Sequence, residues 1–324
     1  MKVLVTGCCG FIGFHLCKKL LDIKVIKVFG IDNLNNYYDI NLKKSRLKFL
    51  KKNKNFKFNK IDICDDKKLN KNFKINKYNY VVNLAAQAGV RYSILNPKQY
   101  FNSNLLGFFN VLEASRSNKN IKHLIFASTS SVYGNSQKFP LKESDETSKP
   151  LTFYAASKKS NEVMAHSYSN IYKLPTTALR FFTVYGPYGR PDMALFKFTE
   201  SIVKEKKLEL YNNGNHYRDF TYVDDIVEAI VKLIPKPSKK DIPFEVYNLG
   251  SSKPIFLKKY LKIIENQLNK KGKVTNKKLQ IGDVKKTHAS TQKFNREIGK
   301  IKLTHISKGI SNFIKWYLMH YKKK

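Results

Sequence analysis

The chain has 324 residues, of which 42% are hydrophobic and 13% aromatic, and its formal net charge is +37. Such a length suits one large α/β unit, or a large and a smaller unit that share a cleft, and either would bury a sizeable core. No apolar stretch approaches the roughly 20 residues of a transmembrane helix, and the opening MKVLVTG lacks the parts of a signal peptide, so we expect a cytoplasmic protein with no membrane partner.

The positive charge is mostly lysine. Only seven of the 61 Lys and Arg residues are Arg, and the lysines are spread along the chain among many Asn and Ile, as a coding bias toward A and T would produce. We therefore predict a solvated basic surface and no nucleic-acid partner, although such a surface attracts anions over a distance. Under this bias Arg should persist where a planar, bidentate guanidinium is needed. The seven are Arg46, Arg91, Arg116, Arg180, Arg190, Arg218 and Arg296.

In the first half of the chain, short apolar runs alternate with helical patterns, which is typical of βα units that build a parallel sheet. Strands are predicted at 2–6, 24–31, 56–61, 80–84, 123–128 and 176–181. Helices are predicted at 11–21, 97–117 and 154–172. This order predicts an α/β fold with a doubly wound parallel (Rossmann) sheet.

Beyond about residue 182 the pattern becomes irregular, with turns at GPYGRP, NNGNHY and PKPSKK. We therefore assign residues 1–181 to the Rossmann domain, which also receives 219–249. Residues 182–324 are assigned mainly to a smaller C-terminal α/β region that binds the substrate. No metal is expected, because the four cysteines match no zinc spacing and the seven histidines show no ligand cluster.

Three glycines stand directly between the first strand and the first helix. Gly7, Gly10 and Gly13 form GxxGxxG, where a tight turn, close backbone approach and helix packing each exclude a side chain. The helix N-terminus behind them favours an anion such as a pyrophosphate. Asp32 ends the second strand, where its carboxylate can accept from ribose hydroxyls. We predict NAD rather than NADP, because no Arg follows until Arg46; the alternative is a glycine turn with no ligand.

Tyr154 and Lys158 stand four residues apart at the start of a helical pattern, so they share one helix face. A neighbouring ammonium and a cationic nicotinamide would lower the tyrosine pKa from about 10 and make the phenolate a general base. Thr129, at the end of the fifth predicted strand, could share the proton. The alternatives are a chance helix-surface pair and, for 128–131, a solvated run of hydroxyls.

Seven segments together resemble the extended short-chain dehydrogenase/reductases, and among them the UDP-glucuronate 4-epimerases. They are VTGCCGFIGFHL, GIDNLNNYYD, VVNLAAQAGVRYS, SSVYG, YAASKKSNEVMAHSY, LPTTALRFFTVYGPYGRPDMALFKFT and RDFTYVDDIVEAI. The resemblance implies that NAD oxidises the sugar 4-hydroxyl, that the 4-keto intermediate rotates, and that hydride returns to its other face. It adds as cofactor residues Phe11, Ile12, Asn33, Asp62, Ile63, Leu84, Ala85, Ala86, Gln87, Asn104 and Phe181.

The resemblance also implies a UDP-sugar substrate and its contacts. Arg218 would hold the diphosphate through its guanidinium, or alternatively cap a nearby helix. A uronate would give a β-keto acid intermediate, whose carboxylate must be held against loss of carbon dioxide. The candidates for this task are Thr129, Ser130, Ser131, Thr183 and Arg190, with Arg91 as a weaker choice. Arg190 could instead be a loop residue that binds backbone groups.

The residues after Thr129 discriminate among related reactions. Sugar-nucleotide dehydratases carry an Asp-Glu pair there and uronate decarboxylases a nearby Glu, whereas this chain has Ser130 and Ser131. We therefore rank interconversion of UDP-glucuronate and UDP-galacturonate first, UDP-glucose 4-epimerisation second and decarboxylation third. A basic NAD- or nucleic-acid-binding protein without catalysis is the alternative of another class. Relatives pack helices such as 97–117 and 154–172 into a four-helix bundle, so we expect a homodimer.

Overall fold

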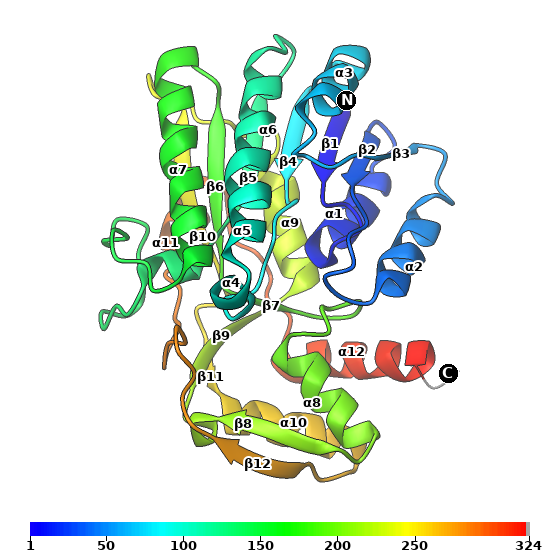
Figure 1. The fold of residues 1–324 in the computed structure, drawn as a ribbon, viewed down its shortest axis with the longest axis vertical. Helices are drawn as coiled ribbons and strands as arrows, with labels where there is room; N and C mark the ends of the chain where they lie inside the picture. The colour runs from blue at the N-terminus through cyan, green and yellow to red at the C-terminus, as the bar shows by residue number, and fades with distance from the viewer. Residues whose placement is uncertain (322–324) are drawn as a thin grey trace.

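The computed structural model describes residues 1–321, and its centre is a seven-stranded parallel sheet (Figure 1). The strand order is β10-β6-β5-β4-β1-β2-β3, with every neighbouring pair parallel. The strands are β1 (Lys2–Thr6), β2 (Lys27–Asp32), β3 (Phe56–Lys60), β4 (Tyr80–Asn83), β5 (His123–Thr129), β6 (Thr176–Phe181) and β10 (Phe244–Leu249). The predicted doubly wound α/β fold is confirmed.

Helices cover both faces of this sheet, because successive strand residues point to opposite faces and both sets are apolar. Val3 and Val5 of β1 join a core on one face, and Leu4 joins a separate core on the other. The first face is covered by α1 (Phe11–Leu21), α2 (Ile40–Leu50), α9 (Val223–Leu233) and α11 (Gln292–Glu297). The second is covered by α3 (Asp66–Asn76), α6 (Gly107–Arg116) and α7 (Phe153–Tyr172).

The predicted helix at 97–117 is present, but its helix type changes along its length. It comprises α5 (Pro97–Tyr100), a π-helical stretch η1 (Phe101–Leu106) and α6, and a short α4 (Tyr92–Leu95) precedes it. The wider turn of a π-helix alters the direction of side chains and is frequent at functional sites. Here it carries Asn104, which is buried against the loop that follows β4.

A smaller region lies below the carboxyl ends of the large sheet (Figure 1). Its three-stranded sheet has the order β11-β9-β7, and β8 pairs in parallel with β12. These strands are β7 (Thr183–Tyr185), β8 (Lys207–Tyr211), β9 (Tyr217–Tyr222), β11 (Pro254–Phe256) and β12 (Lys273–Lys277). A third apolar core fills the space between them and the helices α8 (Ala194–Val203), α10 (Leu257–Leu268) and α12 (Ile306–Tyr321).

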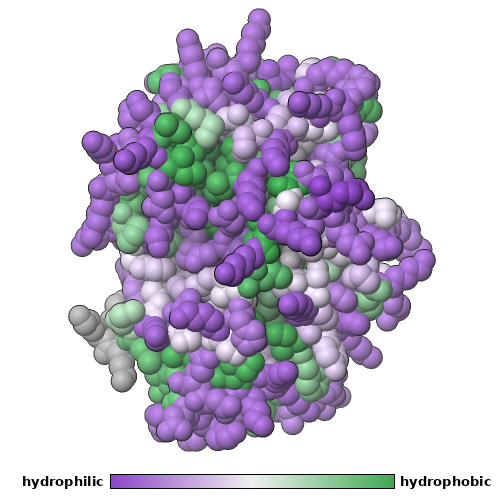
Figure 2. All heavy atoms as spheres, turned by 180° about the vertical axis from the view of Figure 1, so that it is seen from behind, coloured by the Kyte–Doolittle hydropathy of each residue, from purple (hydrophilic) through white to green (hydrophobic). Residues whose placement is uncertain are grey.

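Hydrophilic side chains cover most of the molecular face shown in Figure 2, and hydrophobic ones form smaller patches among them. This agrees with the expected solvated lysine surface. Among residues 1–321, no helix has the length and apolar content needed to cross a membrane.

Candidate active site

A cavity of about 380 Å³ lies at the carboxyl ends of the parallel strands, between the large sheet and the smaller region. In open α/β sheets this is the edge at which ligands bind. Most of the predicted site residues line the cavity: Gly7, Gly10, Phe11, Ile12, Gly13, Asp32, Asn33, Asp62, Ile63, Leu84, Ala85, Ala86, Gln87, Thr129, Ser130, Ser131, Tyr154, Lys158, Phe181, Thr183 and Arg190.

The glycine loop closes one end of the cavity and leaves no space for side chains. Gly7 has a φ of +67°, and a Cβ there would lie 2.8 Å from the backbone nitrogen of Ala85. A Cβ on Gly13 would lie 2.2 Å from the carbonyl oxygen of Gly7. Helix α1 begins at Phe11 with no side-chain cap, so its first N–H groups remain available to a ligand. The loop therefore fits the pyrophosphate of a dinucleotide.

Asp32 stands at the end of β2 in a fixed orientation. One carboxylate oxygen accepts from the backbone N–H of Cys9 at 3.0 Å, and the other from that of Leu34 at 2.8 Å. Its remaining lone pairs suit the ribose hydroxyls that the sequence predicted for it. Arg46, the next arginine, is fully buried, so it cannot serve a 2′-phosphate at the cavity. This arrangement favours NAD over NADP.

Asn104 does not line the cavity, contrary to the prediction. Its side-chain oxygen accepts from the backbone N–H of Gln87 at 2.8 Å, while its amide donates to the Gln87 carbonyl and to Ser157 Oγ. Because Gln87 itself lines the cavity, Asn104 supports the wall from behind. The π-helical turn of η1 allows it to reach this loop.

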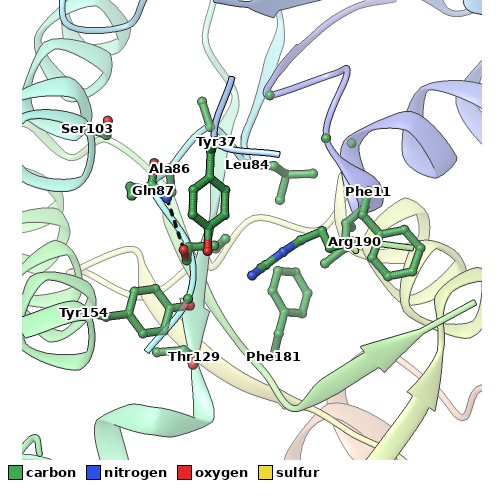
Figure 3. A pocket seen from close by; sticks show the side chains of 18 of the residues that line it. Phe11, Tyr37, Leu84, Ala86, Gln87, Ser103, Thr129, Tyr154, Phe181 and Arg190 are labelled. Carbon is green, nitrogen blue, oxygen red and sulfur yellow. Dashed lines mark hydrogen bonds between the residues drawn. The ribbon is translucent and has the colours of Figure 1, made fainter. Parts of the chain in front are cut away.

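The first turns of α7 present Tyr154 and Lys158 to the cavity, as predicted. Thr152 caps this helix by accepting from the backbone N–H of Ala155. The Lys158 ammonium donates to the carbonyl oxygen of Ala127 at 2.8 Å, which fixes it beneath the end of β5. Figure 3 shows the Tyr154 ring pointing toward Thr129.

The protonation of this pair differs from the expectation. Burial raises the pKa of Tyr154, although the Thr129 hydroxyl and the charge of Arg190 partly oppose the rise. Burial also lowers the pKa of Lys158 to about 8. Desolvation therefore outweighs the opposing effects of Thr129 and Arg190, and the lowering expected from the Lys158 ammonium is not seen. A bound cationic nicotinamide would favour the phenolate.

The hydroxyl run 128–131, at the end of β5, is partly buried, so its interpretation as a solvated run is wrong. Ser128 donates to Glu162 at 2.6 Å beneath the surface, while Thr129 accepts from the backbone N–H of Ser131 at 3.2 Å. Ser130, Ser131 and Thr183 face the same cavity as Tyr154. This end of the cavity therefore offers several short hydroxyl donors to an anionic or polar group.

Arg190 points into the cavity between Tyr37 and Phe181 (Figure 3). Its Nε and one terminal nitrogen donate to the two carboxylate oxygens of Asp192, at 2.9 and 2.5 Å. Tyr37 donates to the same carboxylate at 3.2 Å. Arg190 thus forms a bidentate ion pair rather than the backbone bonds of the alternative interpretation, and its other terminal nitrogen remains available.

Arg91 and Arg218 lie outside the cavity lining and meet at Asp283. Arg218 donates to Asp283 at 2.8 Å and to His216 Nδ1 at 2.7 Å, and Arg91 lies 3.7 Å from the same carboxylate. Arg218 also donates to the carbonyl oxygens of Tyr217 and Lys285, and none of its partners belongs to a helix, so the helix-cap alternative is wrong. The two arginines form a cationic group beside Val90, which lines the cavity.

Residues 3–250 match the model of the NAD dependent epimerase/dehydratase family. The chain belongs to this family. It is 50% identical to Protein CapI of Staphylococcus aureus, with 100% of both chains covered. It is 40% identical to a probable UDP-glucuronate 4-epimerase of Rhizobium meliloti, with 100% of this chain and 98% of the relative covered.

Among solved structures, UDP-glucuronic acid 4-epimerase from Bacillus cereus, in complex with UDP-glucuronic acid and NAD, matches this epimerase/dehydratase family member with a TM-score of 0.93. The identity is 32%, and the match covers 99% of this chain and 100% of that one. The predicted resemblance to extended short-chain dehydrogenase/reductases and UDP-glucuronate 4-epimerases is confirmed.

Several residues of this epimerase/dehydratase cavity were missed from the sequence. Lys43 lines the cavity near Asp32 and donates to the backbone and side-chain oxygens of Asn35 at 2.8 and 2.6 Å. Tyr37 and Asp192 position Arg190. The spacing of Arg190 and Asp192 in GRPD could have indicated an ion pair, whereas no local pattern indicates Tyr37, which is 155 residues from Asp192.

Proposed function

We propose that the protein interconverts UDP-glucuronate and UDP-galacturonate by NAD-dependent 4-epimerisation. The observation that carries this proposal is the composition of the catalytic end of the cavity. Among the described lining residues the carboxylates are Asp32 and Asp62, which belong to the cofactor end, whereas Tyr154 is surrounded by hydroxyls and Arg190. Such a site can move a proton and a hydride but has no acid beside the sugar for eliminating water.

The relatives support the same substrate class. The Rhizobium meliloti relative is named for UDP-glucuronate 4-epimerisation, and the Bacillus cereus structure holds UDP-glucuronic acid together with NAD. Both relatives align with nearly the whole of this chain, so the aligned region includes the cofactor end and the sugar end of the site.

Bound NAD would supply the hydride acceptor and donor. The glycine loop would hold its pyrophosphate, Asp32 would bind the adenosine ribose, and Lys158 would orient the nicotinamide ribose. Tyr154, acting as phenolate, would take the proton of the sugar 4-hydroxyl with Thr129 sharing that hydrogen bond. After the 4-keto sugar has rotated, the Tyr154 hydroxyl would return the proton to the new alcohol, so the cofactor leaves the cycle unchanged.

The hydroxyl end of the cavity would hold the sugar carboxylate. The 4-keto form of a uronate is a β-keto acid, which loses carbon dioxide when the breaking bond stands perpendicular to the carbonyl plane. Thr129, Ser130, Ser131 and Thr183 could fix the carboxylate away from that orientation, and Arg190 would add a donor. Arg218 would hold the diphosphate and Arg91 would assist it at the same mouth of the cavity.

Incubation with UDP-glucuronate, followed by proton NMR of the nucleotide sugar, tests this proposal. The 4-epimer, UDP-galacturonate, is the expected product, without net reduction of NAD. A pentose product would indicate decarboxylation instead, and turnover of UDP-glucose alone would indicate a neutral-sugar epimerase. Either result, or no product, would contradict the proposal.

We also propose a cytoplasmic homodimer that has no specific nucleic-acid partner. Phe101, Phe109, Val163 and Ile171 are exposed apolar side chains on η1, α6 and α7, the helices expected at the dimer interface. Phe109→Lys should convert the dimer to a monomer in light scattering after size exclusion.

Retention on DNA should be lost as salt rises from low to moderate concentration, because the lysines make only non-specific contacts.

A further inference from the structure

Arg46 is the one fully buried arginine that belongs to none of the predicted motifs. One terminal nitrogen donates to the carbonyl oxygen of Cys9 and to the hydroxyl of Tyr38, each at 2.7 Å, and the other donates to the carbonyl oxygen of Tyr188 at 2.6 Å. No carboxylate is among these partners, whereas buried Arg180 forms an ion pair with Glu162 at 2.8 Å. A buried guanidinium whose hydrogen-bond partners are all neutral is costly, so this position calls for an explanation.

The two carbonyl partners of Arg46 belong to different ends of the cavity. Cys9 lies inside the glycine loop, and Tyr188 lies two residues before Arg190. Tyr188 has a φ of +54°, a left-handed conformation that an aromatic residue rarely adopts without being held in place. Its ring packs on Phe14 of α1 with the centroids 4.8 Å apart, and His15 donates to the carbonyl of Pro187 at 2.9 Å. The 186–192 loop is therefore attached to the cofactor-binding helix.

We propose that Arg46 is a positioning residue that couples cofactor binding at the glycine loop to the placement of Arg190. The rigid guanidinium fixes the separation of the Cys9 and Tyr188 carbonyls, which a flexible lysine ammonium cannot do. An anionic pyrophosphate on the front of the loop offsets the cost of the cation behind it, so the ligand and the Arg46 contacts stabilise each other. This inference rests on the proposed function, because Arg190 acts on a bound UDP-sugar.

The first test measures the affinity for UDP-glucuronate in NAD-free and NAD-loaded protein by calorimetry. NAD should tighten the binding to the wild-type chain about tenfold, within the usual range for coupled sites. In Arg46→Lys this ratio should fall to about twofold or less. Arg296→Lys, at an exposed arginine, is the matched control and should keep the wild-type ratio. A folded Arg46→Lys protein with the wild-type ratio would overturn the proposal, even if its melting temperature were lower.

A second measurement needs no variant. Hydrogen exchange at the amides of 186–193 should slow when NAD is added to the wild-type protein in the absence of a sugar. Unchanged exchange in this loop would overturn the proposal even if Arg46→Lys does not fold. Failure of the proposed function would look different, because wild-type protein would then bind or convert no UDP-glucuronate while the exchange experiment still reported the response of the loop.

Discussion

The cofactor end and the sugar end of the cavity are built by different means. At the cofactor end, backbone atoms of a short contiguous loop make the wall, and Gly7 and Gly13 pack so closely that neither accepts a Cβ. At the sugar end, side chains from distant segments make it: Tyr37 and Arg190 both meet at Asp192. One wall is a rigid shape and the other is a network of charges and hydroxyls.

The two walls should therefore respond differently to amino-acid substitution. A shape made by backbone either accommodates its ligand or does not, because added atoms cannot move aside in a packed loop. A charge network can be altered stepwise, because each hydrogen bond or charge contributes a modest part of the interaction. Substitutions at the cofactor end should therefore weaken cofactor binding strongly, and those at the sugar end should change selectivity between substrates.

The largest effect is expected where the two ends meet, at Tyr154. Tyr154→Phe removes the proton acceptor and keeps the ring, so kcat should fall about 10³-fold or more while NAD remains bound, in line with loss of a general base. Turnover by NMR and cofactor content after denaturation measure the two effects. Tyr172→Phe, at the exposed end of the same helix, is the control and should keep both. Full activity of Tyr154→Phe would refute the assignment.

Gly13→Ala should have the next largest effect. It should weaken NAD binding without altering the sugar end of the cavity. The new Cβ would lie 2.2 Å from the Gly7 carbonyl oxygen. Overpacking at the upper end of the usual 1–3 kcal/mol would weaken NAD binding by about 100-fold. Fluorescence titration with NADH measures this affinity.

Gly272→Ala is the matched control for that substitution, because its nearest neighbour would be 3.4 Å away. It should leave the affinity unchanged. Equal NAD affinity in Gly13→Ala and the wild type would show that the loop is not the pyrophosphate cradle.

The two ends of the cavity also differ in how well the sequence predicts them. Strands β1 and β6 and helix α1 were predicted with their observed bounds, because each is a local apolar pattern with clear punctuation. The glycine loop and the Tyr154 and Lys158 pair could also be predicted, since their geometry depends on neighbours in sequence. Most residues predicted for the cofactor end therefore line the cavity, whereas Lys43 was missed and Asn104 lies behind the wall.

The sugar end could be predicted only in part, because its contacts join distant residues. Nothing near Tyr37 in sequence indicates that it reaches Asp192, and nothing near Arg91 or Arg218 indicates that Asp283 draws them together outside the cavity. The π-helical stretch that places Asn104 behind the wall was missed for a related reason. Its side-chain pattern resembles an ordinary helix, and the contact of Asn104 with Gln87 joins residues 17 apart in sequence.

Asp192→Asn tests whether the charge of Arg190 acts on the sugar carboxylate. Loss of the carboxylate leaves Arg190 without a countercharge, so the NAD-loaded protein should prefer UDP-glucuronate over UDP-glucose about fivefold more than the wild type does. The ratio of the two dissociation constants, from calorimetry, reports this change. Tyr37→Phe keeps the charge of Asp192 and should leave the ratio nearly unchanged. An unaltered ratio in Asp192→Asn would mean that Arg190 does not face the sugar carboxylate.

The smallest expected effect concerns Lys158, whose ammonium lies between the two ends. Burial lowers its pKa to about 8, whereas a lysine in the unfolded chain titrates near 10.5. The unfolded state therefore holds more protons above pH 8, so this group makes the protein more stable as pH rises through that value. Between pH 7.5 and 8.5 the unfolding free energy, measured in urea relative to Lys158→Met, should rise by on the order of 1 kcal/mol or less.

The difference between wild type and Lys158→Met isolates this titration from that of the many surface lysines. A constant difference across this pH range would show that the ammonium is well solvated, and the pair with Tyr154 would then lack the desolvated setting described above. A rising difference would show that the fold tolerates a costly buried cation at the junction of the two ends. The buried cation is Lys158, which donates to the carbonyl oxygen of Ala127 and would orient the cofactor. At such a residue a requirement of catalysis is expected to lower the stability of the fold.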